Sequence, residues 1–156
     1  MKDLMKREKI VVHHSASPTT VRRGKKTVPV DADMIREWHL ANGWSDIGYN
    51  YVILPDGRCE DGRPLNLPGA HCKAGGRNFI GIGICLVGNF SLTKVPEAQL
   101  KGLVDKILSL MAEHELKVSD VELHREVPEA HTECPGKYFP AEGLRKRLGE
   151  RVKLIN

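Results

Sequence analysis

The sequence predicts a single α/β domain in which a mixed central β-sheet is flanked by about three helices. Short apolar runs typical of strands alternate with segments whose apolar residues have helical spacing, as in proteins that pack helices on a sheet. A chain of 156 residues is long enough to bury a substantial core. No repeat, low-complexity segment or linker divides it, so we expect one domain over residues 1–156 with its core at about 9–148.

Five extended segments, two of them joined as one hairpin, are expected to build the sheet. The apolar run at residues 9–14 ends in two histidines. Residues 49–54 and 58–61 flank a Pro-Asp-Gly turn and predict a hairpin. The run IGIGICLV at residues 80–87 is typical of a central strand buried on both faces, and residues 121–123 form a short alternating strand. The sequence does not determine the order of these strands in the sheet.

Three helices and one polar loop account for the remaining long segments. Residues 17–26 are polar and basic and predict a loop. The first helix follows Asp31 or Asp33, either of which suits an N-cap, and ends at Asn42. The second begins near Pro96, ends near Leu116 and carries an apolar stripe. A basic helix is expected over residues 139–148.

Composition narrows the possible partners and location. The net charge of +4 would favour an anionic polymer, either cell wall or nucleic acid. With 5% aromatic residues and no interleaved stacking motif, nucleic-acid binding is not supported. No apolar run is long enough to cross a bilayer, and the charged start MKDLMKREK is unlike a signal peptide. We therefore expect a protein without a transmembrane segment, cytoplasmic as synthesised.

His124 and Cys134 are candidate metal ligands near the C-terminus. Imidazole and thiolate together suit zinc, and His13 at the end of the first strand is a candidate third ligand. Strand alternation places His13 and His14 on opposite sides, so only one can face a given site. Such a set leaves the fourth tetrahedral position for water, as in a catalytic zinc site. From spacing alone, a hydrogen-bonded surface histidine and a small buried cysteine remain the commoner interpretations.

Five motifs then occur together and in a fixed order. They are VVHHSAS (11–17), WSDIGYNY (44–51), GAH (69–71), GICLVGNF (83–90) and the segment from His124 to TECPG (132–136). Together they resemble the zinc-dependent N-acetylmuramoyl-L-alanine amidases, which include small phage amidases and animal peptidoglycan recognition proteins. The resemblance covers about residues 10–148. It implies hydrolysis of the amide between N-acetylmuramic acid and L-alanine in peptidoglycan.

The resemblance also implies roles for individual residues. His13, His124 and Cys134 match the zinc ligands, and Tyr49 matches a tyrosine that assists catalysis beside the zinc. Thr132 stands two residues before the cysteine, where some phage relatives have lysine and active recognition proteins have threonine. A neutral hydroxyl can donate a hydrogen bond to a developing oxyanion but adds no charge, so the proton donor stays open.

Two further residues are assigned to substrate binding through the resemblance. His71 of the GAH motif is expected along the substrate groove, with Asn78 beside it. Asn78 opens an N-x-x-S-I-G pattern in which Gly81 replaces the serine of many relatives. The loop between the second and third ligands is longer than in the small phage amidases. It contains His131, which could replace a ligand or line the groove.

The expected biological role is that of a phage or prophage endolysin that reaches the wall through a separate holin-type protein. A cytoplasmic wall-recycling amidase would have the same sequence requirements. A peptidoglycan-binding module without activity is a further alternative, as is an interaction protein, because some phage amidases of this fold restrain an RNA polymerase. A structural zinc would need a fourth protein ligand such as His131 or Cys72. We expect a monomer, with the other cysteines as free thiols.

Overall fold

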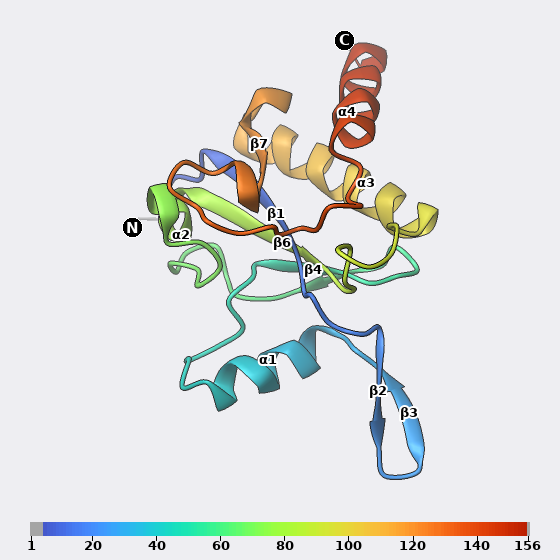
Figure 1. Ribbon diagram of the computed structural model, residues 1–156. Coiled ribbons are helices and arrows are strands. Elements are labelled where there is room, and N and C mark those ends of the chain that lie inside the picture. Colours follow the sequence, from blue (N-terminus) through green and yellow to red (C-terminus); the bar gives the residue numbers. More distant parts are fainter. Residues whose placement is uncertain (1–4, 156) are drawn as a thin grey trace.

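A five-stranded mixed β-sheet lies at the centre of the computed structural model, which describes residues 5–155 (Figure 1). Its strands, in the spatial order β5-β4-β6-β1-β7, are β1 (Lys9–His14), β4 (Tyr51–Ile53), β5 (Cys59–Asp61), β6 (Gly81–Leu86) and β7 (Val121–Leu123). β1 runs parallel to β6 and β7, and β4 runs parallel to β6. Only the hairpin partner β5 is antiparallel. The sheet is therefore mixed, as predicted.

The two central strands are the most apolar ones in the sequence. Every residue of β6 is buried, and so is every residue of β1 after Lys9. A parallel strand buried in this way needs cover on both faces of the sheet. In Figure 1, α3 (Glu97–His114) and α4 (Ala141–Ile155) lie on one side of the sheet and α1 (Ala32–Ala41) lies on the other.

The three predicted helices are present, and the description of about three is refined to four α-helices within residues 5–155. The additional one, α2 (Arg77–Ile80), is a single turn that leads directly into β6. Four residues are too few to show helical periodicity, which is why the pattern did not indicate it. Short 3₁₀ turns occupy Ala74–Gly76, Val118–Asp120 and His124–Glu126.

The helix boundaries follow ordinary capping chemistry. The carboxylate of Asp31 accepts a hydrogen bond from the backbone N–H of Met34 at 2.9 Å, so Asp31 and not Asp33 is the N-cap of α1. Helix α3 ends where Glu115 adopts a left-handed conformation with φ of +56°. Helix α4 continues past its predicted end at residue 148 as far as Ile155.

The prediction of a loop over residues 17–26 was wrong. The segment forms a separate antiparallel hairpin of β2 (Thr20–Arg23) and β3 (Lys26–Pro29). Val21 pairs with Val28 across the hairpin, and both pack against the core beneath α1. A single apolar residue on each strand gives too weak an alternation to stand out among basic residues.

The helices also bear on membrane association. Within residues 5–155, no helix combines the length and the apolar character that a bilayer crossing requires. The most apolar elements are the central strands, and their apolar side chains are covered by helices.

Gly57 and Gly102 let α3 approach the β4–β5 turn closely. Substitution of one of them tests this packing. A Cβ on Gly102 would overlap the backbone carbonyl of Gly57. Alanine normally stabilises a helix interior by about 1 kcal/mol relative to glycine. We expect Gly102→Ala instead to lower the free energy of unfolding by about 1–3 kcal/mol through overpacking, as measured by urea titration.

Gly149 in α4 provides the matched control, because a Cβ there meets no atom within 4 Å. Gly149→Ala is expected to raise the free energy of unfolding by about 0.5–1 kcal/mol. The same sign for both substitutions would contradict the packing described here.

Candidate metal centre

The direction of His13 follows from the alternation of β1. Ile10 and Val12 point into the core beneath α3 and α4, whereas Val11 points to the opposite face of the sheet. His13 lies on the same side as Val11 and is 1% exposed. The ring of His14 points the other way, where its Nδ1 accepts a hydrogen bond from the backbone N–H of Phe90 at 3.1 Å.

Three potential ligands converge where β1 and β7 end. His124 follows β7 directly, and Cys134 lies in the loop beyond it. The ligand atoms offered by His13, His124 and Cys134 all lie within 4.8 Å of one another. His13 Nδ1 is 3.8 Å from the Cys134 Sγ. Ligands on a tetrahedral zinc ion would be about 3.5 Å apart, so small movements would complete the site.

The loop that carries Cys134 is held by the residue next to His124. The backbone N–H of Arg125 donates to the Cys134 carbonyl at 2.9 Å. The Arg125 guanidinium donates to the Gly136 carbonyl at 2.8 Å. A Cβ on Gly136 would overlap the backbone of Phe90, so glycine lets the loop lie directly on the segment that follows β6. Protein contacts alone therefore place the thiol beside the imidazoles.

His71 lies behind His13, away from the thiol. Its Nδ1 is 2.9 Å from His13 Nε2, and its own Nε2 is 3.1 Å from the Gly81 carbonyl oxygen. The Asn78 side-chain oxygen accepts the backbone N–H groups of His71 and Cys72, each at 2.8 Å. The structure thus brings His71 to the metal-ligand cluster and directs the oxygen of Asn78 into the backbone of the GAH loop.

An open cavity of about 460 Å³ lies over the cluster. Tyr49 and Thr132 line it together with the cluster residues. The Tyr49 ring centroid is 5.2 Å from that of His13, and burial raises the pKa of the Tyr49 phenol well above its ordinary value. Tyr49 therefore stays protonated at neutral pH and can act as a hydrogen-bond donor. The Thr132 hydroxyl accepts a hydrogen bond from the Cys134 backbone N–H at 3.2 Å.

The electrostatics of the cluster favour neutral imidazoles. Burial lowers the pKa of His13 well below 6.5 and also lowers the pKa of His124. Burial raises the pKa of the Cys134 thiol to about 11. The backbone N–H of His14 points at the Cys134 Sγ from 3.4 Å and favours the thiolate. A metal ion would therefore meet lone pairs on both histidines and would displace the proton of the thiol.

The other candidates considered from the sequence lie outside this cluster. Within residues 5–155, His13, His124 and Cys134 form the one group of His, Cys, Asp or Glu side chains close enough to share an ion. His131 is exposed, and Cys72 is buried against Val11 and Val127.

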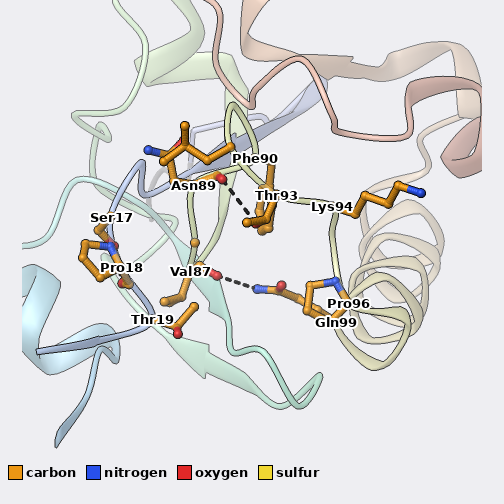
Figure 2. Close-up of a pocket in the computed structure, with 12 residues that line it drawn as sticks. Ser17, Pro18, Thr19, Val87, Asn89, Phe90, Thr93, Lys94, Pro96 and Gln99 are labelled. Atoms are coloured by element: carbon orange, nitrogen blue, oxygen red, sulfur yellow. Dashed lines mark hydrogen bonds between the residues drawn. The ribbon is translucent and has the colours of Figure 1, made fainter. Parts of the chain in front are cut away.

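A second cavity, of about 440 Å³, adjoins the first (Figure 2). It lies between residues 17–19 and residues 87–99, and Asn89 lines both cavities. Figure 2 shows the Gln99 side chain donating to the Val87 carbonyl, at 3.0 Å. The buried amide of Gln99 thus fixes part of the backbone that lines this second cavity.

Sequence reasoning missed two arginines that position the site. Arg125 holds the ligand loop, and Arg7 is 2% exposed beneath His71. Arg7 donates to the carbonyls of Leu65, Leu67 and Gly81 at 2.7–2.9 Å. Both lie next to other charged residues, a pattern that typically marks solvated surface, so composition carries no signal of their contacts within the protein.

Comparison with known proteins identifies the family and the fold. A family model described as N-acetylmuramoyl-L-alanine amidase matches residues 4–137. The chain is 34% identical over 147 residues to an endolysin of Klebsiella phage KP32, covering 94% of this chain and 87% of the relative.

Solved structures agree with this match. The N-acetylmuramoyl-L-alanine amidase LysC from Clostridium intestinale superimposes with a TM-score of 0.78 at 32% identity, covering 93% of this chain and 87% of that one. A second solved structure is the ectodomain complex of peptidoglycan recognition proteins LCa and LCx bound to tracheal cytotoxin. It superimposes with a TM-score of 0.70 at 25% identity, covering 91% of this chain and 84% of that one.

The lowered histidine pKa values predict how the zinc-free protein responds to acid. Unfolded histidines bind protons below about pH 6.5, whereas burial holds the pKa of His71 to about 4 and that of His13 below its ordinary value. The unfolded state thus binds more protons, and lowering the pH from about 7 to 5 should reduce the free energy of unfolding. The loss should reach up to about 1.4 kcal/mol per pH unit for each buried histidine.

Urea titrations in the presence of a chelator would measure this slope. Stability that stays constant or rises over this pH range would show that the buried histidines accept protons in the folded state.

Proposed function

The chain belongs to the N-acetylmuramoyl-L-alanine amidase family, and we propose that it works with a zinc ion bound by His13, His124 and Cys134. The substrate would be the amide between N-acetylmuramic acid and the L-alanine of the peptidoglycan stem. The observation that carries the proposal is the convergence of two imidazoles and one thiol within 4.8 Å at the wall of an open cavity.

The residues present fit zinc by their chemistry. Two nitrogens and one sulfur are the donors that zinc prefers, and three protein ligands are typical of its catalytic sites. Both imidazoles are neutral, and Cys134 has an N–H group beside its sulfur to support a thiolate. When bound, zinc would polarise the amide carbonyl and lower the pKa of a water molecule.

Tyr49 and Thr132 are proposed to supply hydrogen bonds around the reacting amide. Tyr49 remains protonated because burial raises the pKa of its phenol, and its side chain lines the same cavity as the ligands. The Thr132 oxygen accepts the Cys134 N–H, which leaves its own O–H as a donor. Both groups can stabilise negative charge that develops on the carbonyl oxygen, and neither brings a full positive charge.

The biological role that we propose is that of a phage or prophage endolysin. The support comes from the phage KP32 endolysin, whose identity to this chain extends over most of both sequences. We propose that the protein is made in the cytoplasm and reaches peptidoglycan through a separate holin-type protein. The neighbouring cavity that shares Asn89 would accommodate a part of the substrate beyond the cleaved amide.

Replacement of the sulfur ligand tests the metal site. Cys134→Ser should reduce bound zinc from about one ion per chain to a small fraction and abolish release of stem peptides from purified peptidoglycan. Cys59→Ser is the matched control, because Cys59 is exposed on β5, outside the cluster. Full zinc and activity after Cys134→Ser would refute the ligand assignment. A zinc-loaded parent without cleavage would favour a binding or interaction protein, which a pull-down from host lysate would then identify.

Tyr49→Phe tests the role of the phenol separately from metal binding. The substitution keeps the ring and removes the donor, so zinc content should stay at the parent level while kcat falls roughly 10²-fold. Tyr138→Phe should leave kcat unchanged, since Tyr138 is exposed and does not line the cavity. An undiminished kcat in Tyr49→Phe would exclude the phenol from catalysis.

A further inference from the structure

His13 has two ring nitrogens, and they face different partners. Its Nδ1 faces the Cys134 Sγ at 3.8 Å, and its Nε2 faces His71 Nδ1 at 2.9 Å. A neutral imidazole carries one proton, so only one of its nitrogens can bind a metal ion at a time. Whatever determines the proton position on His13 therefore determines whether its lone pair points toward the cluster.

The hydrogen bonds behind His13 settle that proton position. The Gly81 carbonyl can only accept, so the Nε2 of a neutral His71, 3.1 Å away, must carry the proton. His71 Nδ1 is then an acceptor, and His13 Nε2 must donate to it. The lone pair of His13 is left on Nδ1, on the side of Cys134. The hydrogen bonds from His13 to His71 and from His71 to the Gly81 carbonyl thus assign both tautomers without reference to any ligand.

His71 is itself closely held. The Asn78 side-chain oxygen binds its backbone N–H at 2.8 Å. Its ring lies against Gly83 of β6, where an added Cβ would come within 2.6 Å of ring carbons. Arg7 donates to the same Gly81 carbonyl at 2.9 Å and so fixes the direction of that acceptor. Any side chain larger than glycine at position 83 would push the ring off its bonds.

We propose that His71 is a positioning residue for the zinc ligand His13, and that Asn78 and Gly83 serve by holding His71. The inference rests on the metal site proposed above. It gives His71 and Asn78 a role other than the substrate binding expected from the sequence. His71 lines the cavity over the cluster and is 8% exposed, and both of its ring nitrogens have partners within the protein, so neither nitrogen is free for a substrate. Outer partners of this kind orient ligating histidines in metal sites.

Two substitutions at position 71 separate acceptor chemistry from bulk. His71→Leu fills much of the space but removes the acceptor for His13. His71→Asn keeps a carbonyl oxygen near the position of Nδ1. In a competition titration against a chromogenic zinc chelator, we expect His71→Leu to weaken zinc binding roughly 10–100-fold. His71→Asn should recover most of that loss, and His131→Leu should match the parent.

The parent protein provides a measurement that needs no substitution. In the zinc-free state, ¹⁵N NMR should find His13 with its proton on Nε2 and His71 with its proton on Nε2. A proton on His13 Nδ1 would overturn the inference, because the lone pair would then point away from the cluster. This readout remains decisive if a variant at position 71 fails to fold.

The outcomes distinguish this inference from the proposed function. If Cys134→Ser leaves zinc affinity unchanged in the same titration, the metal site itself is wrong. If Cys134→Ser loses zinc while His71→Leu binds it as the parent does, only the positioning role fails. A raised KM for His71→Leu at parent zinc affinity would overturn the inference and restore His71 as a substrate contact.

Discussion

Parallel pairing of β1 with β6 and β7 is the constraint on which the site depends. Ile10 pairs with Val121 and Val12 pairs with Leu123. One residue further along lie His13 of β1 and His124, the residue that follows β7. On the other side, Val11 pairs with Gly83, which lies beneath the His71 ring. A shift of one residue in either register would turn a ligand to the opposite face. The same pairing that buries the apolar residues therefore aligns the metal-binding side chains.

Hydrogen bonds to the backbone compensate most of the burial of polar groups around this pairing. Arg7 binds four carbonyls, Asn78 binds two N–H groups, and Gln99 donates to the carbonyls of Ile53 and Val87. Arg7 Nε and Gln99 Oε1 are buried without a partner in the part of the chain that the structure describes. An unpaired buried polar group costs about 1–3 kcal/mol, so each of these side chains strongly favours one backbone conformation. Side-chain hydrogen bonds therefore hold the irregular segments beside the sheet in place, and a metal site can be built on them.

The cluster is assembled by the protein and completed by deprotonation. Arg125 and Gly136 hold the Cys134 loop in place, and His71 orients His13, with no ion involved. Binding a metal ion still requires that the Cys134 thiol lose its proton, and burial raises the pKa of that thiol. Affinity for zinc should therefore depend on the thiol, while the geometry of the imidazoles is largely prepared beforehand.

The sequence by itself determined most of the elements and singled out the candidate ligands. Uninterrupted apolar runs marked β1 and β6, capping residues marked α1 and α3, and ordered motifs singled out His13, His124 and Cys134. Tertiary structure alone decided what lies behind those ligands. His71 meets His13 across 58 residues of sequence, and Arg7 meets Gly81 across 74, and neither contact leaves a local pattern. Periodicity reports which face of an element is buried, whereas the hydrogen-bond partner of a buried polar group depends on how separate segments pack together.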